Sequence, residues 1–188
     1  MSYHKDNLKG QLVDVAWEIC LAESWQSVNM RKVAKKAEVS TTAFYRHFRN
    51  KNDLKAELMR RGFELIEGGR KSANTFALYG AYYIRFGLDY PHIYDLMFGN
   101  IDLEIDLRLY PDLKAQFDAS FDGLVEGLRP FMPDTPEKDL MVKAVNIWAS
   151  CHGLVGILRR QTWQPNVSEN LEWIENNLEE YLRMTTFR

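Results

Sequence analysis

Residues 28–54 read VNMRKVAKKAEVSTTAFYRHFRNKNDL, and this stretch decides the fold. Asn29 and Ser40 are residue types that cap helix N-termini, and a segment with helical spacing of apolar residues follows each of them. The first segment runs to about Lys36 and the second to about Phe48. The stretch therefore predicts two short helices joined by a tight turn.

Longer helical patterns flank this pair on both sides. Before it, apolar residues recur at helical spacing and predict a first helix that ends near Glu23. After it, Asn50 is a plausible cap for a fourth helix. Three short helices followed by a longer one are typical of a helix-turn-helix unit. The residues at helical spacing in the first helix are Leu8, Leu12, Val15 and Ile19, and the residues that mark the buried side of the fourth are Leu54, Leu58 and Leu65.

The remaining sequence also has only helical periodicity. An aromatic stripe from Phe76 to Tyr90 is followed by Pro91, which suits the first position of the next helix. We expect a helix from about Leu113 that Pro130 closes, and then a long helix capped by Thr135 and extending to about Arg160. After a break at Pro165, Ser168 caps the last helix. The predicted fold class is all-α.

Composition favours a globular protein of the cytoplasm. The 188 residues are 46% hydrophobic and the N-terminus lacks the apolar core of a secretory signal. Cys20 and Cys151 lie inside apolar helical patterns, so we expect reduced buried thiols. The most apolar run, 140–158, is expected to be a buried helix and not a membrane span, because four polar residues interrupt it. These residues are Lys143, Asn146, Ser150 and His152.

Charge is distributed unevenly along the chain. Residues 1–62 hold 12 Lys and Arg against 7 Asp and Glu, a net +5, whereas residues 63–188 hold 12 against 19, a net −7. The net charge of the whole chain is −2. A basic first part joined to an acidic body suggests that only the first part binds a polyanion, although chance also produces such a split.

The segments RKVAKKA, VS and FYRHFRNKNDL, at their spacing in residues 31–54, resemble the DNA-binding domain of the TetR family of bacterial transcriptional regulators. Further on, YYIRFGLDYPHIYDLMF and WASCHG resemble the C-terminal domain called WHG, which occurs in one branch of that family. The chain departs from the family at Glu38, where the turn usually has Gly. The resemblance implies a DNA-binding domain over residues 1–52 and a helical effector-binding and dimerisation domain over 53–188.

In such a motif the third helix enters the major groove of double-stranded DNA, and its N-terminal residues reach base edges. Phe44 and Phe48 are then the apolar anchors of the helix, and its polar residues face outward. Helix N-termini nearby attract phosphate. The residues expected to contact a palindromic operator are Asn29, Arg31, Ser40, Thr41, Thr42, Tyr45, Arg46, His47 and Lys51.

The resemblance also implies a small-molecule effector that releases a repressor from DNA, and a homodimer. Buried tyrosines need hydrogen-bond partners and form sites for partly aromatic ligands, although such a stripe is first of all core. The expected pocket residues are Tyr79, Tyr82, Tyr83, Tyr94, Trp148 and His152. The expected dimer contacts, on the last two long helices, are Gly153, Gly156, Leu171, Ile174 and Leu178.

An all-α enzyme or a protein-binding adaptor that retains the motif is the alternative. A di-iron bundle needs Glu-x-x-His on two helices, and the chain offers only Asp89-x-x-His92, split by Pro91. The sequence has no Gly-rich phosphate loop, no CxxC and no nucleophile with an evident His partner. We therefore predict no catalytic residues, no metal and no cofactor.

Overall fold

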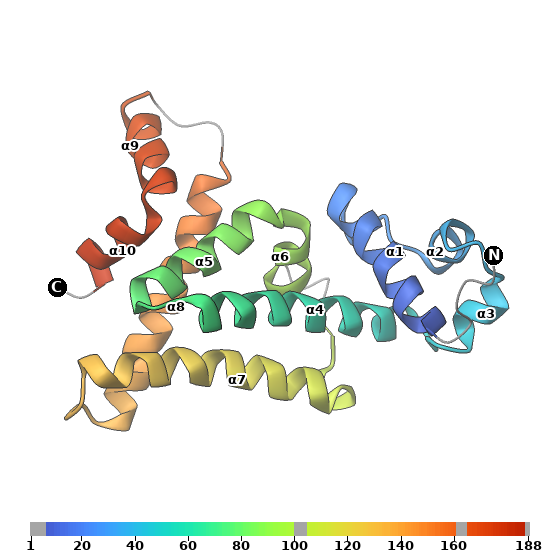
Figure 1. Cartoon of the computed structure of the whole chain (residues 1–188), viewed down its shortest axis with the longest axis horizontal. Coiled ribbons are helices and arrows are strands. Elements are labelled where there is room, and N and C mark those ends of the chain that lie inside the picture. The colour runs from blue at the N-terminus through green and yellow to red at the C-terminus, as the bar shows by residue number, and fades with distance from the viewer. Residues whose placement is uncertain (1–6, 100–104, 161–164, 187–188) are drawn as a thin grey trace. The chain divides into compact units, whose positions relative to one another are not determined.

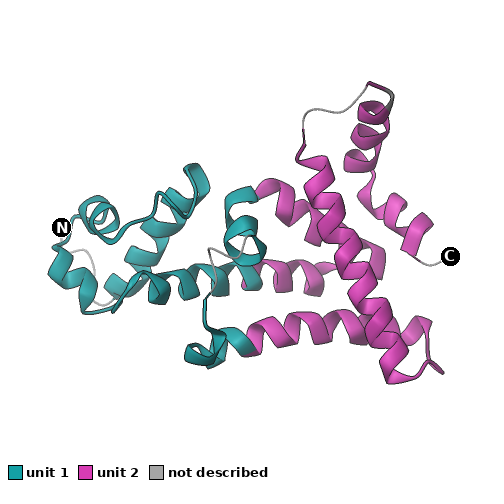
Figure 2. Cartoon of the chain, turned by 180° about the vertical axis from the view of Figure 1, so that it is seen from behind, with its two compact units in different colours: residues 1–63, 90–114 teal, residues 64–89, 115–188 magenta. Residues whose placement is uncertain are grey.

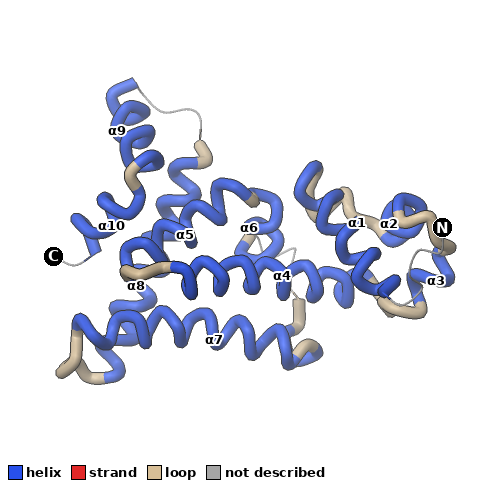
Figure 3. The backbone as a smooth tube through the Cα atoms, in the orientation of Figure 1, coloured by secondary structure: helices blue, strands red, loops and turns tan. Residues whose placement is uncertain are grey.

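The computed structural model describes residues 7–99, 105–160 and 165–186, and every regular element in these ranges is a helix (Figure 1; Figure 3). The all-α prediction is confirmed. The described residues pack into two compact units (Figure 2). Unit 1 contains residues 1–63 and 90–114, and unit 2 contains residues 64–89 and 115–188.

Unit 1 is built on the predicted helix-turn-helix. α1 (Leu8–Ala22) packs against α2 (Met30–Lys36), and α2 packs against α3 (Thr41–Tyr45). α6 (Pro91–Phe98) packs on α1, and the short 3-10 helix η3 (Leu107–Leu109) follows it in the chain. α3 is shorter than predicted, because Arg46 is its C-cap and only turn residues lead on to Phe48.

Two long helices, α4 (Lys51–Ser72) and α7 (Pro111–Leu128), contribute residues to both units. In α4 the predicted Leu54 and Leu58 are fully buried. Leu65 is 41% exposed, so its predicted burial is wrong, and Ile66 is buried in its place. Ile66 follows the buried Met59 and Phe63 at spacings of four and three residues, so it continues their face of the helix and Leu65 lies at the edge of that face.

Unit 2 has α5 (Phe76–Asp89) at its centre, with α8 (Glu137–Leu158) and α10 (Leu178–Thr186) packed against it. The 3-10 helix η4 (Arg129–Phe131) follows α7, and α9 (Pro165–Asn176) packs on α10. Gly80 of α5 allows the close approach of α10, because a Cβ there would lie 2.8 Å from Leu182 Cδ1.

Three of the predicted helix boundaries are wrong, each for a local structural reason. α8 begins at Glu137 with Pro136, not Thr135, at the capping position. Pro165 begins α9 instead of breaking the chain, so Ser168 lies inside the helix. The last helix is divided at Asn177, whose side-chain Nδ2 donates to the Trp173 carbonyl at 2.8 Å and competes with regular helical bonding.

α8 is long and apolar enough to cross a membrane by length and composition alone. The core helix of a soluble protein passes the same test, so one such helix is weak support for a membrane protein. Only 28% of the apolar window is buried within the chain, which is less than the predicted core helix requires. The exposed apolar residues of α8 are therefore a feature to be explained.

Candidate functional site

α3 is held by a cap at its start and by two aromatic anchors. The Ser40 Oγ accepts a hydrogen bond from the Ala43 N–H at 3.1 Å, as predicted for an N-cap. Phe44 and Phe48 are 0% and 1% exposed, and their ring centroids lie 5.3 Å apart. The anchors leave the remaining face of the helix in a fixed orientation towards solvent.

Four predicted DNA contacts are exposed on this face. Thr42 lies in the first turn, and Tyr45, Arg46 and His47 follow it, while Thr41 is half-buried. Tyr45 is 47% exposed and packs edge-on against Phe44. Across the described residues, the side chains of Thr42, Arg46 and His47 make no hydrogen bond or ion pair within the chain. These groups are therefore available to another molecule.

The start of α2 contributes a second part of the same surface. The Asn29 Oδ1 accepts from the Lys32 N–H at 2.9 Å, which confirms the predicted cap. Lys32 Nζ is 2.6 Å from Glu23, and its hydrogen bond holds the pKa of that carboxyl below its usual value. Lys36 pairs with Glu18 at 3.0 Å. Arg31 is exposed and forms no ion pair with a described residue, so it remains the best candidate for a phosphate contact.

The turn between α2 and α3 has left-handed backbone at Glu38, where φ is 56°. The Val39 N–H donates to the Ala34 carbonyl at 3.0 Å and the Glu38 N–H to the Lys35 carbonyl at 3.2 Å. This pair of bonds is the Schellman motif, which usually has Gly at the left-handed position. The chain's departure from the family pattern therefore carries a conformational cost, about 1 kcal/mol.

Lys51 is directed towards the protein in this structure. Its Nζ donates to the Trp25 carbonyl at 3.1 Å and lies 4.4 Å from the centroid of the Trp25 ring. Burial lowers the pKa of this amine. Lys51 thus ties the start of α4 to the loop before α2, and its predicted contact with phosphate stays a prediction.

The first turn of α4 also contains a group that sequence reasoning missed. The Asp53 carboxylate accepts from the Arg49 backbone N–H at 2.9 Å, from Arg49 Nε at 3.0 Å and from the Tyr110 hydroxyl at 2.9 Å. Burial raises the pKa of Asp53, but these hydrogen bonds outweigh it and leave the pKa below its usual value. Arg49 follows α3 with its side chain 81% exposed, so it belongs to the candidate DNA surface.

In unit 2, three of the predicted pocket residues lie together. Tyr83 Oη is 2.8 Å from His152 Nε2, and Trp148 Nε1 donates to Tyr83 Oη at 3.3 Å. The rings of Trp148 and His152 are 4.7 Å apart, and Phe121 stacks edge-on against Trp148 at 6.1 Å. We call Tyr83, Phe121, Trp148 and His152 the aromatic cluster.

The hydrogen bonds of the cluster have a preferred direction. Because the Trp148 N–H donates to the Tyr83 oxygen, the hydroxyl proton of Tyr83 is best placed to donate to an unprotonated His152 Nε2. Burial lowers the pKa of His152 and favours this neutral form. Phe121, Trp148 and His152 remain half-buried although they pack on one another, so their rings keep accessible surface.

The other predicted pocket residues have different surroundings. Tyr79 is buried beside Phe76, and burial raises its pKa to about 12. Tyr82 is 41% exposed on α5, while Tyr94 belongs to unit 1 and packs against Phe98. Gln116 of α7 was missed: its buried Oε1 has no hydrogen-bond partner among the described residues, and a single polar residue in a helix gives no signal of this kind.

The predicted dimer residues are only partly at the surface. Gly153 and Gly156 are exposed, and a Cβ added at either would meet no atom within 4 Å. Leu171 and Ile174 are half-buried, whereas Leu178 is buried in the chain's own core. Val142, Val145 and Ala149 are exposed at spacings of three and four residues before Gly153, so they share one face of α8.

No group of three His, Cys, Asp or Glu side chains suited to a metal ion occurs in the described part of the chain. Cys20 and Cys151 are free and buried, as predicted. Burial raises their pKa values, to about 12 and about 11, so both thiols are poor nucleophiles.

Two family models match the sequence. Residues 12–58 match the bacterial regulatory proteins of the tetR family, and residues 76–174 match the tetracyclin repressor-like C-terminal domain. The second match alone covers more than half of the chain. Both halves of the resemblance seen in the sequence are thereby confirmed. No curated protein matches the sequence significantly.

Several solved structures have the same fold. A protein of unknown function from Rhodococcus sp. RHA1 is 21% identical, with a TM-score of 0.70 over 96% of this chain and 98% of that one. AibR in complex with isovaleryl coenzyme A and operator DNA is 15% identical, with a TM-score of 0.60 over 90% and 95%. FadR from Bacillus subtilis in complex with stearoyl-CoA is 19% identical, with a TM-score of 0.57 over 96% and 100%. At these identities the likeness is one of fold.

Proposed function

The chain belongs to the tetR family of bacterial regulatory proteins, and we propose that it is a homodimeric repressor that a small effector releases from a palindromic operator. Its site of action is then the cytoplasm, and it acts by binding and not by catalysis.

The observation that carries the proposal is the exposed face of α3. Thr42, Arg46 and His47 form no side-chain bond to any described residue, and buried rings fix the helix that presents them. Side chains left without partners on a rigid helix keep their hydrogen-bonding capacity for base edges and phosphates.

Two substitutions separate base reading from general attraction to DNA. A duplex selected from a random pool supplies the operator, and fluorescence anisotropy gives the affinity. Thr42→Ala is expected to alter preference at one base position by about 1–3 kcal/mol. Arg31→Ala is expected to weaken binding to all duplexes alike, and it is a cleaner test than Lys51, whose amine bonds to Trp25. If Thr42→Ala keeps the base preference of the parent, Thr42 of α3 does not read a base, and if Arg31→Ala binds every duplex like the parent, Arg31 of α2 does not contact phosphate.

The exposed apolar face of α8 supports a homodimer. A helix that is apolar on most sides needs its core on one face and a partner on another. Trp173 of α9, 43% exposed, adds a second apolar surface. Gly156→Leu has room within one chain, so it should leave the monomer folded and weaken only the dimer. Analytical ultracentrifugation measures the oligomeric state of parent and variant. A parent protein that is monomeric at micromolar concentration would contradict the proposed homodimer.

The aromatic cluster is the proposed effector site. Its accessible rings suit an apolar, partly aromatic ligand, while the Tyr83–His152 pair offers polar contacts. Two regulators of the same fold were crystallised with acyl-coenzyme A molecules, one with isovaleryl coenzyme A and one with stearoyl-CoA. Both ligands have an apolar acyl group, which supports an effector with an apolar part. Effector binding would act on the reading helix through α4, whose residues belong to both units.

Linkage gives this proposal a quantitative test. If an effector lowers the affinity of the protein for the operator by a given factor, the effector must bind the DNA-bound protein more weakly than the free protein by the same factor, typically 5- to 150-fold. Compounds that raise the melting temperature are titrated against free protein and against the DNA complex. A ligand that binds equally to both forms contradicts release by an effector.

A further inference from the structure

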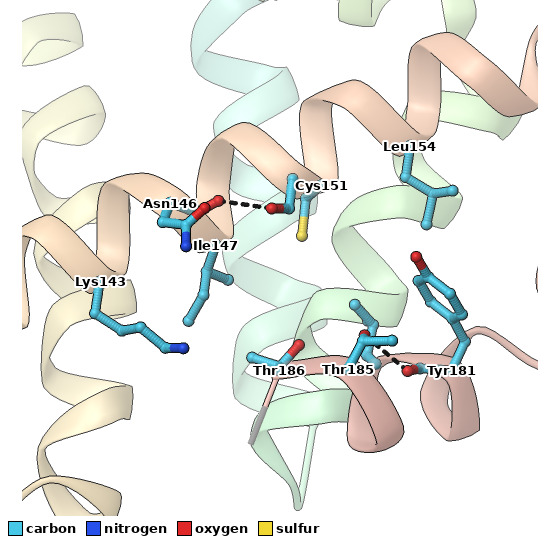
Figure 4. A pocket seen from close by; sticks show the side chains of 10 residues that line it. Lys143, Asn146, Ile147, Cys151, Leu154, Tyr181, Thr185 and Thr186 are labelled. Carbon is cyan, nitrogen blue, oxygen red and sulfur yellow. Dashed lines mark hydrogen bonds between the residues drawn. The ribbon is translucent and has the colours of Figure 1, made fainter. Parts of the chain in front are cut away.

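A pocket lies between α8 and α10 (Figure 4), and no residue of the aromatic cluster lines it. Ten residues line it: Lys143, Asn146, Ile147, Ser150, Cys151 and Leu154 from α8, and Tyr181, Leu182, Thr185 and Thr186 from α10. The family match ends at residue 174, before α10 begins. One wall of the pocket therefore comes from a part of this chain outside the matched domain.

The α10 wall is fixed by specific contacts with α5. Leu182 fills the space that Gly80 leaves, and the hydroxyl of Thr75, the residue before α5, donates to Glu179 at 3.0 Å. Arg85 of α5 also donates to the Glu175 carbonyl at the end of α9, at 2.7 Å. Because α10 is anchored on α5, the gap it leaves against α8 has a defined width.

The pocket has a volume of about 150 Å³. A cavity of about this size holds one benzene-sized molecule. The ligand it suits is therefore a single small ring or a short aliphatic chain.

One end of the pocket is cationic and rich in hydrogen-bond donors. Figure 4 shows the Lys143 side chain reaching from α8 towards Thr186, with Asn146 beside it. Lys143 is half-buried and makes no ion pair with any residue that the structure describes. The Asn146 amide and the Thr186 hydroxyl are likewise without hydrogen bonds to described residues. An ammonium with two neutral donors suits a carboxylate.

The rest of the pocket is apolar or neutral. Ile147, Leu154 and Leu182 supply aliphatic surface, and Tyr181 supplies a ring. The Cys151 thiol points into the same space, and burial raises its pKa to about 11, so it carries no charge at neutral pH. Ser150 and Thr185 donate to carbonyls of their own helices at 2.8 and 2.9 Å and present no free proton.

We propose that the α8–α10 pocket binds a small monocarboxylate of about the size of benzoate. The carboxylate accepts hydrogen bonds from Lys143 and the donors beside it, and the ring or short chain lies against Ile147, Leu154 and Leu182. This site goes beyond the proposed effector site, because it uses neither Tyr83 nor His152.

A comparison of benzoate with benzamide separates the contribution of the ligand's charge to binding from that of its ring. Both are titrated into the full chain at pH 7.5, with calorimetry and saturation-transfer NMR as readouts. In the parent, benzoate is expected to bind at least about tenfold more tightly than benzamide, since a charged hydrogen bond adds to shared ring contacts. Lys143→Met should abolish the preference and leave the melting temperature unchanged.

Two matched variants complete the design. Lys138→Met removes an exposed lysine of the same helix outside the pocket and should keep the preference. Tyr83→Phe alters the aromatic cluster and should also keep it. The proposal is overturned if benzoate and benzamide bind the parent equally or not at all, or if Lys143→Met retains the preference. Loss of the preference in Lys138→Met or Tyr83→Phe places the ligand elsewhere and overturns it as well.

Discussion

The exposed face of α3 and the aromatic cluster use polar groups in opposite ways. On α3 the side chains of Thr42, Arg46 and His47 are unbonded within the described chain, and they come from six consecutive residues. In the cluster Tyr83 bonds both Trp148 and His152, which lie 65 and 69 residues further along the chain. The side chains on α3 keep their hydrogen-bonding capacity for another molecule, whereas those of the aromatic cluster already bond to one another.

This difference separates binding from stability. Removing an exposed, unbonded side chain leaves the folded chain intact and costs only the contacts made with a partner. Removing a member of a buried hydrogen-bonded set leaves other groups without partners and destabilises the fold. The two regions should therefore respond differently to equally small substitutions.

The largest effect is expected from Arg46→Ala. If Arg46 contacts a base or phosphate, operator affinity should fall by about 1–3 kcal/mol, or roughly 5- to 150-fold. The melting temperature should not change, because the parent side chain is exposed and makes no hydrogen bond or ion pair with a described residue. Anisotropy titrations and thermal melts measure the two quantities. A fall in melting temperature without a loss of operator affinity would show that Arg46 supports the fold and not DNA binding.

Tyr83→Phe should behave in the opposite way. Loss of the hydroxyl leaves His152 Nε2 and the Trp148 N–H without this partner, so unfolding should become easier by about 1–3 kcal/mol. Operator affinity in the absence of effector should change little. Tyr82→Phe is the matched control, since Tyr82 is the neighbouring residue and is 41% exposed. Equal melting temperatures for both variants would show that the bonded set contributes nothing to stability.

A smaller effect, of opposite sign, is expected at the turn before α3. Glu38→Gly relieves the left-handed strain at φ 56° and should stabilise the protein by about 1 kcal/mol, which raises the melting temperature by roughly 2–4 °C. Glu38→Ala removes the same charge but keeps a Cβ, so it should give no such gain. Stabilisation by Ala equal to that by Gly would mean that charge, not backbone strain, is the cause.

The smallest effect concerns pH. Burial lowers the pKa of His152 from its ordinary 6.5, so the unfolded chain takes up a proton before the folded chain does. Stability from this group is complete above pH 6.5 and is lost as pH falls from there through the folded pKa. Chemical denaturation between pH 7.5 and 5 should show this decline, and His152→Gln should flatten it.

The sequence predicted the caps and the buried anchors of α2 and α3 well, because local chemistry builds them. Asn29 and Ser40 cap helices wherever helices follow, and Phe44 and Phe48 return at helical spacing. The failures come from contacts between distant segments. Nothing near Leu65 indicates which neighbours cover α4 beyond Phe63, and the anchoring of α10 on α5 joins residues about one hundred positions apart. The same limit hid Gln116, whose significance is only that its neighbours offer it no partner.

The pairing of Lys32, Lys36 and Lys51 within the protein has a consequence for how operator binding depends on salt. A cation that neutralises a phosphate displaces condensed counterions from DNA, and each such contact steepens the fall of affinity with ionic strength by a fixed increment. These three lysines are bonded to Glu23, Glu18 and the Trp25 carbonyl, so they enter the DNA interface only by giving up those partners. Counterion release by each DNA-binding domain should then reflect Arg31, Lys35 and Arg46 more than the total basic charge of residues 1–62. The net positive charge of residues 1–62 would thus overestimate how strongly these residues are attracted to DNA.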